Sequence, residues 1–265
     1  SKNSYVRLKV KVEFRKDLTA SDLPTTSETL NLSFTVNYVQ SDETGTNVTD
    51  NGVKKVLDIV SGDLNTVGSE VAIGDEHFYI ISNTDGEIAM LSKYNLYVGN
   101  SLDSSWNVTP LENQTGIQNS SAIGWFDEFT DDNPAIGTTA FSSTNYWYDG
   151  SALKSEYGTS YPAYVYDSNS TLYNYVESYR TYLESQGAEI EEARLIKMEE
   201  LESLGCSSSS YSCSEAPEWV YGTSYWSGAA YDNIRVWGVN SEGEFGHNYS
   251  YNNFRGVRPV IVLKS

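Results

Sequence analysis

The segment that most restricts the fold is the C-terminal stretch 243–263, with the sequence GEFGHNYSYNNFRGVRPVIVL. Its second half, from Val257 to Leu263, is an apolar run that is typical of a buried strand. Its first half contains Gly, Asn, Tyr, Ser and His residues with no obvious period. We therefore expect a polar and aromatic surface segment that a core strand holds still.

The other patterns predict mixed helices and short strands, which indicates an α+β fold. A helix is predicted over 169–186, where apolar residues recur at helical spacing and Gly187 follows as a stop signal. Two apolar runs flank an Asn-Thr-Asp-Gly turn and predict a hairpin over 77–91. The other predicted elements are alternating strands at 5–14 and 30–38, short helices at 53–64 and 196–205, and strands near 220–226, 234–239 and 257–263.

The distribution of charge suggests two units. The net charge is −19, which argues against a nucleic-acid partner. Residues 1–16 nevertheless carry a local +5. We expect residues 1–50 to form a β-rich stalk or packing unit and residues 51–265 to form the binding domain. No apolar run is long enough to span a membrane, and the chain begins without Met, so we expect membrane attachment only through an N-terminal anchor outside this sequence.

Cys206 and Cys213 lie seven positions apart in a Ser-rich stretch, GCSSSSYSCS. This spacing suggests a small loop closed by a disulfide in an exported protein, with two free thiols as the alternative. A zinc site would need two further ligands, and His77 and His247 are the only histidines. We expect no metal and no cofactor, and an extracellular location on a cell or virion surface.

The C-terminal half resembles a known family in three stretches: APEWVYGTSYWSG at 216–228, VWGVNSEGEF at 236–245 and GVRPVIV at 256–262. These stretches resemble the C-type lectin fold in its formylglycine-generating-enzyme-like branch, and more closely the variable proteins of diversity-generating retroelements. The resemblance implies a C-type lectin-like domain with small antiparallel sheets and two main helices. It also implies a variable region at about 225–262, which binds a protein or cell-surface ligand whose identity the sequence does not give.

The composition of the expected variable region agrees with that resemblance. Half of segment 228–255 is Tyr, Asn, Gly and Ser, the residues that antibody loops favour. An apolar frame flanks it, and we expect the other side chains to form one solvent-facing patch; a functionless surface loop is the alternative. The candidate ligand-binding residues are Tyr231, Asn233, Arg235, Asn240, Glu244, His247, Asn248, Tyr249, Tyr251, Asn252, Asn253, Phe254 and Arg255.

Other functions are weaker interpretations of the sequence. A formylglycine-generating-type enzyme is one alternative, but its active site needs a cysteine pair, and the Ser-rich cysteine loop does not resemble that site. A structural, pilin-like surface subunit is the other. The acidic pairs Glu191–Glu192 and Glu199–Glu200 are typical of exposed faces of short helices rather than of a catalytic dyad. Asp131 and Asp132 could hold calcium, although a solvated turn is the simpler interpretation. We therefore expect no enzymatic activity.

Overall fold

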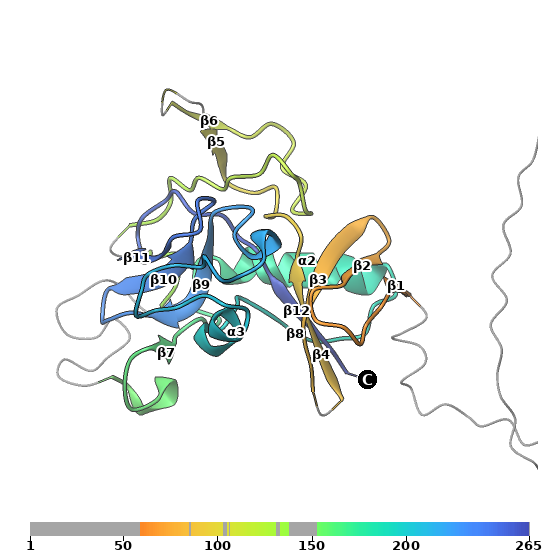
Figure 1. Cartoon of the computed structure of the whole chain (residues 1–265). Helices are drawn as coiled ribbons and strands as arrows, with labels where there is room; N and C mark the ends of the chain where they lie inside the picture. Colours follow the sequence, from red (N-terminus) through yellow and green to blue (C-terminus); the bar gives the residue numbers. More distant parts are fainter. Residues whose placement is uncertain are drawn as a thin grey trace, which may run out of the picture. The chain divides into compact units, whose positions relative to one another are not determined.

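A computed structural model describes residues 59–264, apart from 85, 103–104, 106, 131–132 and 138–152 (Figure 1). The expected N-terminal unit 1–50 lies outside the described residues, as does the first half, 53–58, of the helix predicted over 53–64. The described end of that segment is not helical, because Val60 begins a strand. No helix in the described part is long and apolar enough to cross a membrane.

The larger sheet is antiparallel and has the order β1-β2-β3-β4-β12-β8. The predicted hairpin is confirmed as the β3–β4 pair, and the predicted C-terminal strand is confirmed as β12, between β4 and β8. The strand at β8 was not predicted; Glu191 and Glu192 lie on it and not on a helix. The bounds are β1 Val60–Gly62, β2 Glu70–Ile73, β3 Glu76–Thr84, β4 Glu87–Ser92, β8 Ile190–Arg194 and β12 Val260–Lys264.

From Val260 to Leu263, strand β12 is apolar without alternation because both of its faces are covered. Ile261 and Leu263 belong to one hydrophobic cluster, whereas Val260 and Val262 belong to another. Since successive side chains of a strand point to opposite faces, a strand with a core on each side must be apolar at every position. The C-terminal strand therefore joins the two cores of the domain.

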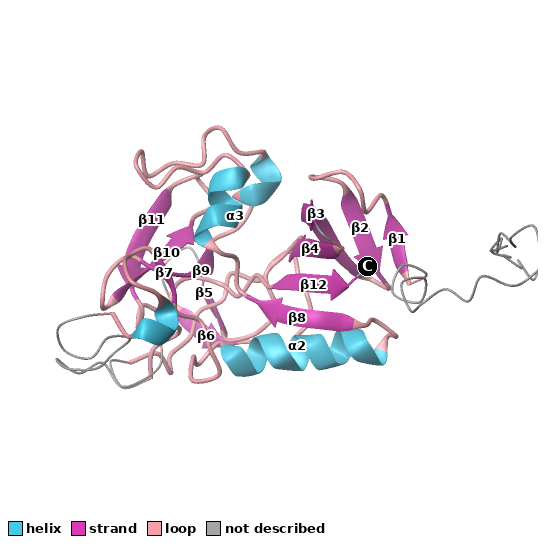
Figure 2. Cartoon of the chain, turned by 90° about the horizontal axis from the view of Figure 1, so that it is seen from below, coloured by secondary structure: helices cyan, strands magenta, loops and turns pink. Residues whose placement is uncertain are grey.

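Two α-helices lie on opposite sides of strand β12 (Figure 2). Helix α2, Tyr173–Ser185, confirms the main part of the predicted helix and buries Val176, Tyr179 and Leu183 in the first cluster beside β8. Helix α3, Met198–Ser203, confirms the second predicted helix and buries Met198 and Leu201 in the second cluster. The fold is thus α+β, with small antiparallel sheets and two α-helices in the described part.

The smaller sheet has the order β11-β10-β9-β7 and carries the segment of interest. The prediction of a strand from 220 is wrong, because residues Glu218–Val220 form a 3₁₀ turn and the strand begins only at Tyr225. The stretch after Gly243, which has no obvious period, contains an edge strand. The bounds are β7 Ala163–Tyr164, β9 Tyr225–Ala230, β10 Arg235–Val239 and β11 Phe245–Tyr249; β5 Asn100–Leu102 and β6 Val108–Pro110 form a separate pair.

Arg258 ties the two sheets together just before β12. Its side chain is 1% exposed, and it donates to four backbone carbonyls: Nε to Ser92 at 2.7 Å, Nη1 to Val220 at 2.9 Å, and Nη2 to Trp219 at 2.8 Å and Lys93 at 3.2 Å. The guanidinium also lies over the Tyr225 ring. One buried cation therefore joins the end of β4, the 3₁₀ turn and the approach to β12.

Candidate binding site

The strand register divides the candidate residues between two faces of the smaller sheet. In the antiparallel β10–β11 pair, Arg235 lies opposite Tyr249, Trp237 opposite His247, and Val236 opposite Asn248. Directly opposed residues share a face, and neighbouring residues alternate. Arg235, His247 and Tyr249 are therefore on one face, and Asn248 is on the other. The expectation of one common patch is wrong.

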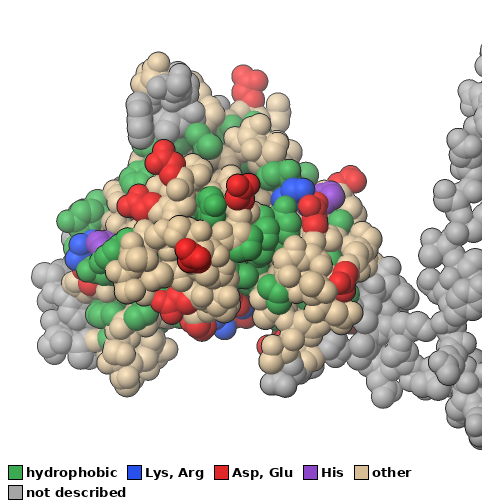
Figure 3. Space-filling model, in the orientation of Figure 1, with side chains coloured by type: hydrophobic (Ala, Val, Ile, Leu, Met, Phe, Trp, Pro, Cys, Tyr) green, Lys and Arg blue, Asp and Glu red, His purple; other side chains and the backbone are tan. Residues whose placement is uncertain are grey.

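The first face is a cluster of rings around Trp237, and we call it the aromatic face: Tyr211, Tyr231, Arg235, Trp237, His247 and Tyr249. His247 stacks on Tyr231 with ring centroids 3.6 Å apart. The Trp237 ring meets both of these rings edge-on, at 5.3 Å and 5.5 Å. In Figure 3 a histidine and a basic side chain lie among hydrophobic side chains at the edge formed by β10 and β11.

Arg235 is held in place over this cluster by the turn between β9 and β10. Its Nε donates to Asp232 Oδ2 at 2.7 Å, and its guanidinium lies 4.7 Å from the centre of the Tyr231 ring. Asp232 Oδ1 also accepts from the backbone amides of Ile234 and Arg235, which fixes the turn in which Asn233 lies. The face therefore presents a cation and several rings in one defined geometry.

The disulfide loop supplies the remaining ring. The predicted Cys206–Cys213 bond is present, and Tyr211 lies inside the loop that it closes. The Tyr211 ring lies 5.6 Å from Trp237 and 5.8 Å from His247. The Phe245 amide donates to the Tyr211 carbonyl at 3.1 Å, and the Cys213 amide donates to the Gly243 carbonyl at 2.8 Å. The disulfide loop is thus docked on the start of β11.

We expect the free energy of unfolding of a Cys206→Ser, Cys213→Ser double variant to be about 2–3 kcal/mol lower than that of the parent, because the crosslink no longer restricts the unfolded chain. Urea titrations of the two proteins measure this difference. Mass spectrometry of unreduced parent protein from an oxidising compartment should show a mass two hydrogens below that of the reduced chain. Two free thiols in that sample would contradict the assignment.

His247 is expected to be neutral near pH 7. Its pKa is lowered from 6.5, first by burial and then by the positive charge of Arg235, although Asp232 acts in the opposite direction. Because the folded pKa lies below the unfolded one, this residue's stabilising contribution is complete above about pH 6.5 and is lost as the pH falls through the folded pKa.

An NMR titration of the His247 ring in a His77→Gln background measures this pKa without a second histidine. We expect a midpoint below pH 6.5, together with a fall in the free energy of unfolding between pH 7.5 and pH 5.5 that is smaller in the His247→Gln variant. A midpoint at or above that of an unfolded histidine would show that the ring is not held in the neutral form.

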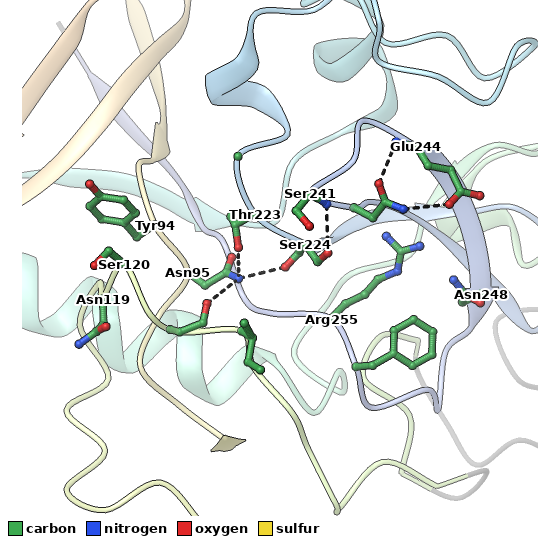
Figure 4. A pocket seen from close by; sticks show the side chains of 15 residues that line it. Tyr94, Asn95, Asn119, Ser120, Thr223, Ser224, Ser241, Glu244, Asn248 and Arg255 are labelled. Carbon is green, nitrogen blue, oxygen red and sulfur yellow. Dashed lines mark hydrogen bonds between the residues drawn. The ribbon is translucent and has the colours of Figure 1, made fainter. Parts of the chain in front are cut away.

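The second face opens into a cavity of about 530 Å³, which we call the polar pocket (Figure 4). Figure 4 shows the Asn95 amide directed at Thr223 and Ser224, and the Arg255 guanidinium in the part that Glu244 and Asn248 line. The pocket is lined by Tyr94, Asn95, Asn119, Ser120, Ala122, Ile123, Gly222, Thr223, Ser224, Asn240, Ser241, Glu244, Asn248, Phe254 and Arg255. Five candidate residues thus line this open cavity, and of these only Arg255 is buried.

Arg255 lies within the protein and not on its surface, so the expectation that its side chain faces solvent is wrong. It is 4% exposed, lies over the Trp226 ring and donates from Nη1 to the Val239 carbonyl at 2.9 Å. A Cβ atom on Gly238 would come within 2.5 Å of Nη1, so only glycine at this position of β10 leaves room for the guanidinium. Burial lowers the pKa of Arg255 to about 10.

Asn95 forms the fixed wall of the pocket. Its Nδ2 donates to Thr223 Oγ1 at 2.8 Å and lies 3.0 Å and 3.2 Å from the carbonyl oxygens of Ser224 and Ala122. The same side chain is 1% exposed, and its Oδ1 has no hydrogen-bond partner in the structure. The nitrogen contacts therefore fix the orientation of an amide whose oxygen is buried without a donor.

The remaining candidates lie between the two faces or beside them. Tyr251 stacks on Tyr249 at 5.1 Å, and the side-chain amide of Asn252 donates to Asn248 Oδ1 at 3.4 Å. The Asn253 carbonyl accepts from the Phe126 amide at 3.0 Å. Backbone contacts thus order the segment between β11 and β12.

Sequence reasoning missed the residues that come from distant parts of the chain. Tyr211 was recognised only as part of a flexible-looking Ser-rich loop. Asn95, Thr223 and Ser224 carried no functional signal, because the Asn95–Thr223 contact joins residues 128 positions apart. Only the folded chain places them beside β10 and β11.

No group of three or more His, Cys, Asp or Glu side chains that could hold a metal is found within the described ranges. Asp131 and Asp132, the possible calcium ligands, lie outside those ranges. Comparisons with protein-family models, with curated proteins and with solved structures find no match to this chain. Its function must therefore be argued from its own residues.

Proposed function

We propose that this is a ligand-binding protein of the retroelement-diversified class, which acts without catalysis and without a cofactor. A C-type lectin-like scaffold would present the region of about 225–262 to a protein or cell-surface ligand. The observation that carries the proposal is the aromatic face, where exposed tyrosines and a cation share one side of the sheet with a buried tryptophan.

The chemistry of this face suits the recognition of a macromolecule. Tyr211 and Tyr249 are 43% and 42% exposed, and Arg235 lies beside them. Tyrosine and arginine are enriched among the residues that dominate binding energies, because each combines a large contact area with hydrogen bonding. A cluster of exposed rings on one face is also a frequent mark of an interaction site.

The rigidity of the face favours tight binding. Tyr231, His247 and Tyr211 all contact Trp237, which is 4% exposed and packs on Phe245 with ring centroids 4.9 Å apart. A surface whose side chains are already ordered loses less conformational entropy when a ligand binds. The arrangement therefore separates residues that support the fold from residues that are free to vary.

An extracellular location is part of the proposal. The Cys206–Cys213 disulfide supports it, because disulfides persist in oxidising compartments and are rare in the cytosol. We place the domain on a cell or virion surface.

The proposal of diversification is tested in the genome. We expect a reverse-transcriptase gene near this one, together with a near-copy of the 225–262 coding region that differs from it mainly at adenines. If the neighbouring sequence holds neither, the diversification proposal fails, while ligand binding by the aromatic face stays open to the next test.

A library of variants tests whether the face is a display surface. Codons for Tyr231, Arg235 and Tyr249 are randomised in one library, and codons for Val236 and Val239 on the same sheet serve as the matched control. We expect most members of the first library to melt close to the parent and most members of the control to unfold. Equal losses in the two libraries would mean that the aromatic face is core, and the proposal would be wrong.

A further inference from the structure

We propose that the polar pocket is a second binding site, for a small organic carboxylate that carries a hydrogen-bond donor near its acid group. In this site Arg255 holds the carboxylate and Asn95 Oδ1 accepts from the donor. The pocket opens on the opposite face of the β10–β11 pair from the aromatic face. The inference therefore stands whether or not the proposed function is correct.

Arg255 differs from the other buried arginines of the described part. Arg258 donates to four carbonyls, and Arg194 forms a two-point contact with Glu200, at 2.6 Å and 2.8 Å, as well as a bond to Glu192. Arg255 has one hydrogen bond, to Val239, and its Nε is buried with no partner. Arg255 is thus a buried cation whose donors are not satisfied.

No carboxylate neutralises Arg255 within the described residues. Glu244 is near enough to favour the charged form of the arginine, but it forms no ion pair with it, and its Oε2 instead accepts from Asn240 Nδ2 at 2.9 Å. A buried charge without a partner is costly, and the planar guanidinium matches the two oxygens of a carboxylate. A bound acid would supply the counterion that the chain does not.

The rest of the pocket defines the other parts of the ligand. Asn95 Oδ1 is buried at the wall of the pocket without a donor, and a ligand amide or hydroxyl group that reaches it supplies the missing hydrogen bond. Phe254 and Ile123 are 38% and 42% exposed and line the same cavity, so they offer an apolar rim above the buried polar groups. A volume of about 530 Å³ lies within the usual range for small-molecule sites.

An N-acylated amino acid combines the three features: a carboxylate, an amide N–H close to it and an apolar group. The same chemistry occurs in a free small acid and at the C-terminus of a peptide. N-Benzoylglycine represents the free acid, and a decapeptide that ends in glycine with a free carboxylate represents the peptide. The corresponding methyl ester and C-terminal amide are the uncharged counterparts.

Isothermal titration calorimetry of the whole chain compares these four probes. We expect at least one of the two acids to bind, and to bind about tenfold or more tightly than its uncharged counterpart, since one lost charged contact costs about 1.4 kcal/mol or more. The acid that binds more tightly identifies the source. If neither acid binds more tightly than its uncharged counterpart, the pocket is a solvent-filled cavity and the proposal is overturned.

Variants assign the contact to Arg255. Arg255→Gln should weaken the binding of the preferred acid tenfold or more, and Arg255→Lys should restore part of it. Arg180→Gln is the matched control, because Arg180 lies on α2, pairs with Glu184 and lines neither the pocket nor the aromatic face. Unchanged binding by a folded Arg255→Gln protein would contradict the proposal.

A spectroscopic measurement on the parent protein decides the case if Arg255→Gln does not fold. The buried Arg255 Nε–H should give a resolved NMR signal that shifts when the preferred acid is added and stays in place when its ester or amide is added. If the acid binds without moving that signal, Arg255 is not its partner and the pocket is not the site.

Discussion

Replacing Trp237 by alanine is expected to lower the free energy of unfolding by about 3–5 kcal/mol, the usual cost of removing a large buried aromatic side chain. For a domain of this size the melting temperature should fall by roughly 6–20 °C. Trp237 packs against Phe245 and His247 from β11, Tyr231 from the β9–β10 turn and Tyr211 from the disulfide loop. Its removal therefore loosens the whole aromatic face.

Tyr249→Ala is the matched control, since Tyr249 lies on the same face but is 42% exposed. Its loss should change the free energy of unfolding by no more than about 1 kcal/mol. Calorimetric melting of both variants beside the parent gives the comparison. If Tyr249→Ala lowers the free energy of unfolding as much as Trp237→Ala does, Tyr249 supports the fold and is not a residue that is free to vary.

Replacing Arg258 by methionine is expected to be similarly severe, with a loss of about 3 kcal/mol or more. Methionine fills part of the volume but removes a donor from four carbonyl oxygens, of which, within the described residues, only that of Val220 keeps a side-chain donor, the Tyr225 hydroxyl at 2.7 Å. Each buried acceptor left unpaired costs about 1–3 kcal/mol. Arg258→Lys should recover little of this, because a lysine ammonium cannot reproduce the fork of the guanidinium. Urea denaturation measures both variants.

Arg180→Met is the reference for this experiment. Arg180 forms partly exposed ion pairs with Glu177 and Glu184 on α2, which are expected to contribute less than about 1 kcal/mol. It donates to one backbone carbonyl, that of Ile190, where Arg258 donates to four. If Arg258→Met unfolds no more easily than Arg180→Met, the two sheets are held together by the hydrophobic clusters alone.

The elements that have a clear local sequence pattern were predictable from the sequence. Strand β12 is apolar from Val260 to Leu263 because a core covers each of its faces, and α2 buries Val176, Tyr179 and Leu183 at helical spacing. The Cys206–Cys213 pair was predicted from its spacing. In each case the local pattern of residues is enough to indicate the element.

Strand β11 could not be predicted, because its stability comes from its partner. Gly246, His247 and Asn248 have little intrinsic preference for a strand, and they adopt one because β10 offers a complete edge for pairing. Because β11 was not predicted, its pairing register with β10 was unknown, and this led to the wrong expectation of a single patch. Without a strand, nothing in the sequence indicated that His247 and Asn248 point in opposite directions.

The polar pocket was hidden for a different reason. Arg255 reads as one more polar residue in a polar stretch, and its burial depends on Gly238 and Trp226, which come earlier in the chain. Asn95 becomes part of the pocket through its hydrogen bonds to Thr223 and Ser224, which lie more than a hundred positions away in the chain. Contacts of this range follow from topology and not from local pattern.

The place of β12 has a consequence for damaged genes. The strand that lies between β4 and β8 in the larger sheet is encoded after the segment that carries the candidate binding residues. A frameshift or stop codon within 231–255 therefore removes this inner strand as well, and the truncated chain cannot pair β4 with β8 through it. Only chains in which this segment is read through in frame contain β12, so we expect truncated products to stay unfolded and to be degraded by proteases.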